Sequence, residues 1–142
     1  MGIAMQRFVG LDVGTKRIGV AICDPLLITT RSLMVVRREP ESKAIEEISK
    51  VCKEYGVTTV AMGLPYNMDG TLGAQAKDCQ DFAKKLEVEA KLEVCFEDER
   101  LTSFEAEQIL ASQGKKYTKN KELVDMMAAE LILQQFINKR SK

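Results

Sequence analysis

Histidine is absent from the 142 residues of this chain, and so is tryptophan. The lack of histidine excludes Ser-His-Asp and Cys-His nucleophilic triads, histidine general bases and metal sites built on histidine. Any hydrolytic chemistry must therefore come from carboxylates, and we expect a hard metal ion to assist them.

A surplus of either charge is also missing, because 21 lysine and arginine residues balance 21 aspartate and glutamate residues. A protein that binds nucleic acid usually carries a basic excess, so such a partner must be held here by a local basic patch. No apolar run approaches the length of a membrane span, and no signal-peptide pattern is present. We therefore expect one globular domain with no membrane partner.

The cysteines form no C-x-x-C pair and are scattered along the chain, at Cys23, Cys52, Cys79 and Cys95. This spacing argues against a zinc site. Separated thiols without an export signal indicate the reducing cytoplasm, and we interpret them as small buried apolar side chains.

Five apolar segments bounded by turn residues predict strands. They cover residues 8–13, 18–23, 30–37, 57–62 and 92–96. Short turns make the first three strands antiparallel, and helical crossovers make the fourth and fifth parallel to the first. The prediction is an α/β fold: a mixed five-stranded sheet, three antiparallel strands and then two parallel ones, with helices on both faces.

Apolar residues at helical spacing predict four helices, and capping residues mark several of their ends. These helices cover about residues 42–55, 76–86, 102–114 and 122–139. The first stops at Gly56, and Thr102 with Glu105 forms a capping box at the start of the third.

Acidic residues gather where strands end. Asp12 lies near the end of the first strand, where an unpartnered buried carboxylate would cost several kcal/mol. The fifth strand ends in Glu97, Asp98 and Glu99. Because the carboxyl ends of parallel strands share one edge, where active sites of open α/β sheets gather, we expect these acids to lie near Asp12.

The last predicted helix supplies a third acid, Asp125. Its spacing puts it on one helix face with Ala129, Ile132 and Phe136, the apolar stripe that must face the sheet. Three inward carboxylates from distant parts of the chain repel each other unless a cation neutralises them. Mg²⁺ or Mn²⁺ suits such oxygen ligands.

Each acid also has a purely structural interpretation. Asp12 could bond backbone amides of its own hairpin, Asp125 could be a polar group of a helix turn, and the run 97–99 could be a solvated strand end. Strand parity separates Asp98 from its two neighbours without naming the ligand. Taken together, the acids favour the metal interpretation.

Two loops are candidates for substrate contact. Residues 62–73, MGLPYNMDGTLG, follow the fourth strand, and a structural turn explains them equally well. Residues 113–121, QGKKYTKNK, place lysines around Tyr117. Such a pattern suits phosphates and an unstacked base, although it is also common in solvent-exposed loops.

Four segments together resemble the YqgF family, also called RuvX, whose members are described as pre-16S rRNA nucleases or Holliday-junction-resolvase-like proteins. The segments are GLDVGTKRIGVA, GLPYNMDGT, DERLTS and VDMMAAELIL, in the family's order over nearly the whole chain. The resemblance implies an RNase H-like fold for a single nuclease domain over residues 1–142, with residues 1–6 as a short extension.

The resemblance also implies which residues act. Asp12, Asp98, Glu99 and Asp125 match the family's catalytic acids, and we favour Glu99 over Asp98 as the ligand from the fifth strand. Asp12, Glu99 and Asp125 would then hold one or two Mg²⁺ or Mn²⁺ ions.

Nucleic acid phosphates are expected to contact basic residues near these acids, namely Lys16, Arg17, Arg100, Lys115, Lys116 and Lys119. The resemblance implies trimming of the 5′ end of the 16S rRNA precursor during ribosome biogenesis. We expect a cytoplasmic protein, a monomer or a weak homodimer.

Other functions are also compatible with parts of the sequence. The same fold and metal site would serve junction resolution in DNA. D-x-G-T on a first hairpin also cradles phosphates in actin-like kinases and ATPases, but those proteins resemble two such domains, and 142 residues leave no room for the second. A catalytically silent nucleic-acid-binding module is separated from a nuclease by measuring activity.

Overall fold

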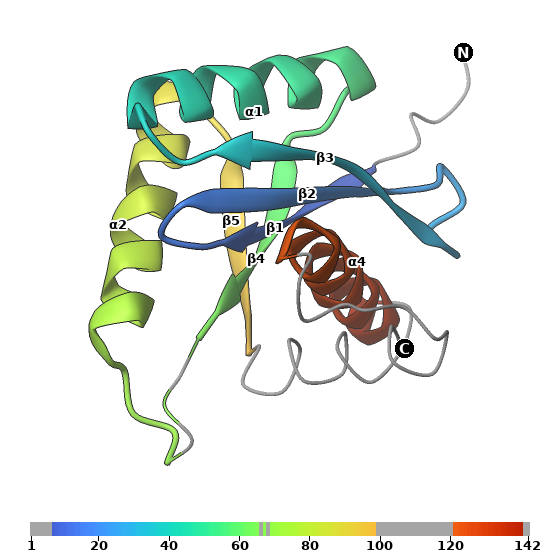
Figure 1. Ribbon diagram of the computed structural model, residues 1–142. Helices are drawn as coiled ribbons and strands as arrows, with labels where there is room; N and C mark the ends of the chain where they lie inside the picture. Colours follow the sequence, from blue (N-terminus) through green and yellow to red (C-terminus); the bar gives the residue numbers. More distant parts are fainter. Residues whose placement is uncertain (1–6, 66, 68, 99–120, 141–142) are drawn as a thin grey trace.

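The computed structural model describes residues 7–65, 67, 69–98 and 121–140, with the backbone alone for residues 121–125. These residues build a five-stranded sheet in the order β3-β2-β1-β4-β5 (Figure 1). The strands are β1 Phe8–Val13, β2 Arg17–Cys23, β3 Thr30–Arg37, β4 Thr59–Leu64 and β5 Glu93–Asp98. β1, β2 and β3 are antiparallel neighbours, whereas β4 runs parallel to β1 and β5 parallel to β4. The predicted mixed sheet is confirmed.

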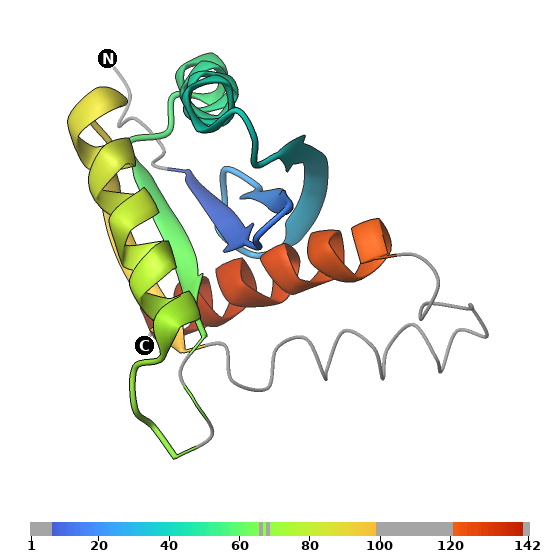
Figure 2. The ribbon, with the colours of Figure 1, turned by 60° about the vertical axis from the view of Figure 1, so that its left-hand side comes forward.

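The helices cover both faces of this sheet (Figure 2). α1 Glu41–Tyr55 and α2 Ala74–Glu89 lie on one face, and α4 Lys121–Arg140 lies on the other. α1 ends where the sequence predicts, because Gly56 adopts a φ of 70° that favours glycine. The predicted helix over residues 102–114 lies outside the described residues.

The predicted ends of the fourth and fifth strands were wrong by one or two residues. Val57 lies beyond the last residue of α1 and helps to cap it, since its N–H donates to the Cys52 carbonyl at 2.7 Å, and β4 starts only at Thr59. β5 continues through Glu97 and Asp98, because both residues pair with β4. Backbone pairing, which the side chains do not reveal, extends the strand into its acidic end.

Two apolar clusters fill the space on either side of the sheet. From β1, Leu11 and Val13 join the larger cluster under α1 and α2, while Phe8 joins the smaller one under α4. This alternation is the period of two that a strand imposes on its side chains. Within the described segments, no helix is long and apolar enough to cross a membrane.

The four cysteines are free thiols, as the sequence indicated. Three are buried, and Cys95 is half-buried. Burial raises the pKa of the Cys52 thiol to about 12, so this side chain stays protonated and behaves as an apolar group.

α4 lies directly on the backbone of β1 at Gly10. A Cβ atom at this position would stand 2.7 Å from the Ala129 carbonyl oxygen and 2.7 Å from the Leu133 Cβ. Both distances are shorter than van der Waals contact allows, so only glycine permits this approach. Gly10 therefore sets how closely α4 approaches the strand that carries Asp12.

We expect Gly10→Ala to push α4 away from the sheet, because the Ala129 carbonyl belongs to the helix backbone and cannot rotate aside. Overpacking of this kind costs about 1–3 kcal/mol of unfolding free energy. Urea unfolding followed by circular dichroism measures the loss.

Gly73→Ala is the matched control. Its added methyl meets only the Asn67 side chain, at 2.9 Å, and that exposed side chain can move. We expect a smaller loss than for Gly10→Ala. Equal losses for both variants would contradict the role assigned to Gly10.

Candidate active site

Asp12 lies near the carboxyl end of β1, on the face of the sheet that α4 covers. Gly10 and Phe8, two and four positions earlier, lie against α4, and side chains two apart along a strand share a face. Asp12 is half-buried, whereas the strand residues on either side of it are buried. The carboxylate therefore stands where the α4-facing core meets solvent.

Glycines flank Asp12 on both neighbouring strands. Asp12 pairs with Gly19 of β2, and continuing the β1–β4 register by one residue places Gly63 on its other side. Neither glycine has a side chain, so no side chain from β2 or β4 projects directly beside the Asp12 carboxylate. Gly63 in turn pairs with Glu97 of β5, which puts Asp12 and Glu97 in one row, about 10 Å apart across two strand spacings.

The Glu97 carboxylate is bound by two side chains of α4. Its side chain is buried, with 6% of the residue exposed. The Gln135 Nε2 donates to Glu97 Oε1 at 2.9 Å, and the Lys139 Nζ lies 3.0 Å from the same oxygen. These contacts neutralise Glu97 and join β5 to the second half of α4, so its carboxylate serves to position the helix.

Asp98, the last residue of β5, lies on the opposite side of the sheet from Glu97. Within β5, Glu97 faces α4 and Val94 packs on the α1 and α2 side. Alternation places Asp98 on the side of Val94, away from the face of Asp12. This placement agrees with the preference for Glu99 over Asp98, although the Glu99 side chain itself is outside the described residues.

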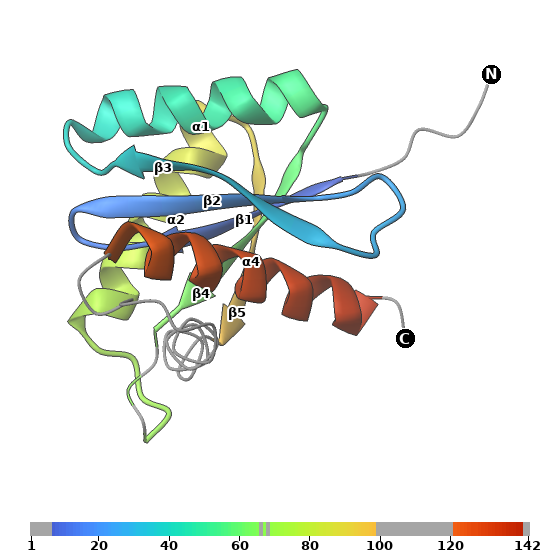
Figure 3. The ribbon, with the colours of Figure 1, turned by 45° about the vertical axis from the view of Figure 1, so that its right-hand side comes forward.

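The backbone of Asp125 lies at the same end of the sheet as Asp12. α4 begins near the β1–β2 hairpin and runs back along the sheet (Figure 3). Ala129 sits on Gly10, and Asp125 precedes Ala129 by about one turn, or roughly 5.4 Å of helix. Asp12 follows Gly10 by two residues, or roughly 6.8 Å of strand. The backbones of Asp12 and Asp125 therefore lie at a similar distance from the Ala129–Gly10 contact, toward the same end of the sheet.

The remaining predicted residues are placed only in part. Glu99, Arg100, Lys115, Lys116 and Lys119 lie outside the described residues. In the part of the chain that is described, no three acidic or cysteine side chains are grouped closely enough to hold a metal ion. Two of the three predicted metal ligands have side chains beyond that part, so the predicted site stays a prediction.

Lys16 and Arg17 belong to the hairpin that follows Asp12. Lys16 is exposed in the turn, and Arg17 opens β2 two residues before Gly19, the partner of Asp12. Arg17 is thus the diagonal neighbour of Asp12 on the α4 face, about 7–8 Å away and within reach of a long side chain. The structure therefore brings Asp12 and Arg17, both predicted site residues, close together.

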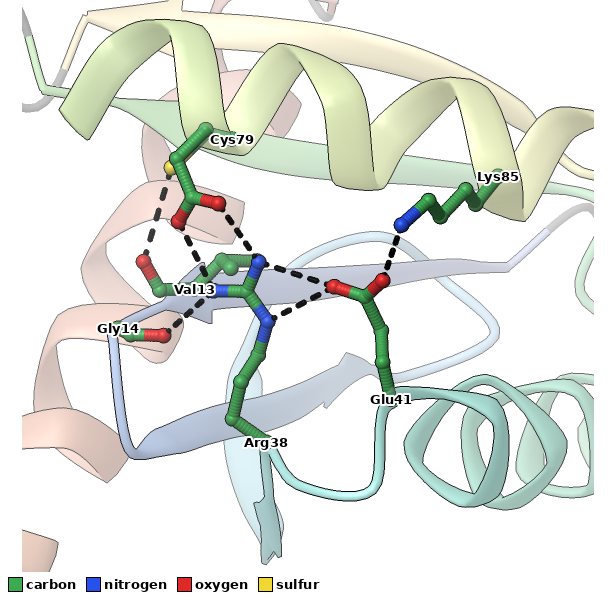
Figure 4. A network of polar contacts seen from close by, with 7 residues as sticks. Val13, Gly14, Arg38, Glu41, Cys79 and Lys85 are labelled. Carbon is green, nitrogen blue, oxygen red and sulfur yellow. Dashed lines mark hydrogen bonds and ion pairs between the residues drawn. The ribbon is translucent and has the colours of Figure 1, made fainter. Parts of the chain in front are cut away.

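A buried guanidinium holds this hairpin from the opposite face (Figure 4). Arg38, with 6% of its surface exposed, donates from Nη1 to the Gly14 carbonyl at 2.9 Å. Its Nη1 and Nη2 also form a bidentate pair with Asp78 of α2 at 3.0 and 2.9 Å. Nη2 further donates to Glu41 of α1 at 3.1 Å. One side chain therefore joins the turn after Asp12 to both helices.

Further contacts extend the same network. The Arg38 backbone N–H donates to the Lys16 carbonyl at 2.9 Å, and the Cys79 Sγ lies 3.6 Å from the Val13 carbonyl oxygen. Lys85 of α2 pairs with Glu41. The hydrogen bonds from Lys85 and then Arg38 lower the pKa of Glu41, which stays ionised at neutral pH.

Sequence reasoning missed Arg38 and the role of Glu97. Arg38 stands in the run Arg37-Arg38-Glu39-Pro40, which reads as a polar boundary between a strand and a helix. Two of its partners, Gly14 and Asp78, come from distant positions, which the local sequence does not reveal. Strand alternation was the available signal: Arg38 follows Val36, a core residue, by two positions.

Comparison with known proteins identifies one family. Residues 6–139 match the family described as RuvX, Holliday junction resolvase. A Synechococcus elongatus protein is 45% identical over 131 residues, covering 92% of this chain and 88% of the relative. A Crocosphaera subtropica protein is 47% identical over 138 residues, covering 96% of both chains. Both relatives carry the provisional name pre-16S rRNA nuclease.

Two solved resolvases share this architecture. Thermus thermophilus RuvC in complex with a Holliday junction superposes with a TM-score of 0.56 at 17% identity, covering 96% of both chains. The fowlpox virus resolvase with Holliday junction DNA gives 0.56 at 13% identity, covering 96% of this chain and 100% of that one. At such identities the likeness concerns the fold, and it confirms the RNase H-like architecture.

We expect Arg38→Met to destabilise the protein by about 2–3 kcal/mol, because it leaves Asp78 and the Gly14 carbonyl without their donor. The loss is smaller than for a fully buried pair, since the Asp78 side chain is 44% exposed and can be rehydrated. Methionine preserves apolar contact with the Phe82 ring, over which Arg38 stacks at 4.9 Å. Urea unfolding measures the difference.

Arg37→Met serves as the control, because it removes the same charge from the adjacent, exposed side chain. Its effect should stay within about 0.5 kcal/mol. If both variants unfold at the same urea concentration as the parent, the network does not hold the hairpin.

Proposed function

Because the chain belongs to the RuvX family of Holliday junction resolvases, and is a nuclease that cleaves phosphodiester bonds, we propose that it is a metal-dependent endonuclease acting on the 5′ end of the 16S rRNA precursor. The proposal places this activity in the cytoplasm and in ribosome biogenesis. It assigns the chemistry to Asp12, Glu99 and Asp125, and it treats the protein as a monomer or weak homodimer.

The observation that supports this proposal best is the surroundings of Asp12. A half-buried carboxylate at the end of a central strand is flanked by Gly19 and Gly63, and the backbone of Asp125 reaches its level on the covering helix. Glycines beside an aspartate leave room for a phosphate and an ion. A purely structural aspartate has no need of such space.

The donor set suits a hard cation. Asp12, Glu99 and Asp125 offer carboxylate oxygens alone, the ligands that Mg²⁺ and Mn²⁺ prefer. Glu97 is unsuited to this role, because Gln135 and Lys139 already occupy one of its oxygens. When bound, one or two such ions would polarise the phosphodiester, lower the pKa of the attacking water and stabilise the leaving oxygen.

The remaining residues orient the substrate. Lys16 and Arg17 lie on the hairpin directly after Asp12, where they would hold phosphates beside the scissile bond. Arg100 and the lysines Lys115, Lys116 and Lys119 would extend this contact. Arg38 and Glu97 keep the strand ends and α4 in place from outside the reacting groups.

RNA is favoured over DNA by the provisional names of relatives that are 45% and 47% identical. A Holliday junction resolvase acting on DNA is the second candidate, favoured by the description of the matching family. A catalytically silent nucleic-acid-binding module is the third. Cleavage assays on precursor-like RNA, single-stranded DNA and four-way junctions with Mg²⁺ or Mn²⁺ separate the three.

We expect Asp12→Asn to abolish cleavage, with a loss of at least about 100-fold in kcat, because the variant removes a metal-binding charge while preserving shape. Thermal stability should stay equal or rise slightly, since repulsion among the carboxylates is relieved. Mn²⁺ should raise the melting temperature of the parent and not that of the variant. Equal cleavage would remove Asp12 from the mechanism, and a folded but much less stable variant would favour a hairpin-bonding role.

Two further variants decide which acid after β5 acts. We expect Glu99→Gln to lose cleavage and the Mn²⁺-dependent rise in melting temperature. Asp98→Asn should keep both, because the parity of β5 directs Asp98 away from the face of Asp12. The reverse result would assign the ligand to Asp98.

A further inference from the structure

α4 crosses the sheet from one edge strand to the other and is hydrogen-bonded to both. The Ser32 hydroxyl of β3 donates to the Met126 carbonyl at 3.3 Å, and Gln135 bonds to β5 further along the helix. Between these points the helix lies on the backbone of Gly10. The contact at Gly10 sets the separation of helix and sheet, whereas the hydrogen bonds, which are directional, set the position of α4 along its own axis.

Gln135 bridges a side chain and a backbone group of β5. Its amide nitrogen carries two hydrogens, and it donates to Glu97 Oε1 at 2.9 Å and to the Asp98 carbonyl oxygen at 3.4 Å. That carbonyl belongs to the peptide bond between Asp98 and Glu99. Because a peptide bond is planar, a hydrogen bond to its oxygen restricts the direction in which the chain continues. Gln135 therefore acts on the backbone that leads into the proposed ligand Glu99.

Lys139 keeps Glu97 in place as the anchor of this bridge. The Lys139 Nζ lies 3.0 Å from Glu97 Oε1, and the Glu97 side chain is only 7% exposed. A carboxylate buried to this extent is costly without a cation. Lys139 follows Gln135 by one helical turn, so both side chains reach β5 from the same face of α4. The paired carboxylate is thus a fixed acceptor for Gln135.

We propose that Gln135 is a positioning residue for the metal site, and that it sets the distance between Glu99, after β5, and Asp125, on α4. This inference rests on the proposed function and adds a residue that acts through the ligands. Asp125 lies about 15 Å of helix before Gln135, so a shift of α4 at Gln135 is carried to Asp125. Groups that orient metal ligands commonly contribute about 10- to 100-fold to metal affinity.

Titration calorimetry with Mn²⁺ alone tests this role without any substrate. Gln135→Leu removes both N–H donors and keeps a side chain that favours the helix. We expect Kd for Mn²⁺ to rise about 10-fold, because the ligands lose their relative position. In cleavage of precursor-like RNA at saturating Mn²⁺, kcat should fall about 10-fold, while KM for the RNA stays within about twofold.

Gln134→Leu is the matched control, because it makes the same substitution at the adjacent position of α4. The Gln134 Nε2 donates to the Ile28 carbonyl at 3.4 Å and to Asn138 Oδ1 at 3.1 Å. Ile28 lies in the hairpin between β2 and β3, at the end of the sheet opposite to Asp12. We expect Kd for Mn²⁺ to stay within about twofold of the parent.

Gln135→Glu separates positioning from charge. It keeps the shape of the side chain, loses both donors and adds a negative charge at a half-buried position. The added charge alone would attract Mn²⁺ and lower Kd, whereas displacement of the ligands raises Kd. We expect weaker binding. Melting temperatures measured without metal confirm that each variant is folded at the temperature of the titration.

The outcomes distinguish the positioning role from the nuclease proposal. Weaker Mn²⁺ binding by both Gln135 variants, and not by Gln134→Leu, supports the role even if no substrate is cleaved, in which case only the proposed activity fails. If Gln135→Leu melts earlier but binds Mn²⁺ like the parent, the bridge serves the fold alone, and the role is overturned while the nuclease stands. Equal weakening by Gln134→Leu, or tighter binding by Gln135→Glu, also overturns it. A parent protein that binds no Mn²⁺ overturns both.

Discussion

The contact between α4 and the backbone of β1 at Gly10 is the constraint on which the candidate site depends. It brings a helix from the end of the described chain to within van der Waals distance of its first strand, where Gly10 contributes no side chain. Small residues on the helix, Ala128 and Ala129, are fully buried there. Because Asp12 and Asp125 lie two residues and about one turn from this contact, its closeness fixes how near their backbones can come.

A second anchor acts from the opposite side of the sheet. Arg38 holds the turn after Asp12 through the Gly14 carbonyl, and it is itself held by Asp78 and Glu41. A buried ion pair of this kind adds little net folding free energy compared with an apolar replacement. It does fix the positions of its partners, because the guanidinium must satisfy several acceptors at once. Asp12 therefore sits between a helix fixed by close backbone contact and a hairpin fixed by hydrogen bonds.

The sequence predicts those parts of the architecture that follow from the regular spacing of apolar residues along strands and helices. Alternation along residues 8–13 placed Asp12 on the face of Phe8 and Gly10, and the helical stripe of Ala129, Ile132 and Phe136 is the buried face of α4. What could not be predicted depends on partners far apart in the chain. Arg38 meets Asp78 across 40 positions, and Glu97 meets Gln135 across 38, so the local sequence does not reveal these partners. The predicted ligand set also stays a prediction, since the side chains of Glu99 and Asp125 are outside the described residues.

The same contacts explain how a chain without net charge can present a local basic surface. Some acidic side chains form ion pairs within the protein: Glu41 pairs with Lys85, and Glu97 pairs with Lys139. β2 and β3 carry arginines but no acids. Potential at a surface depends on which charges are near it and not on their sum over the molecule, since screening limits their range to about 10 Å at moderate salt. A neutral composition is therefore compatible with a polyanionic partner, provided that basic residues stand together at one part of the surface.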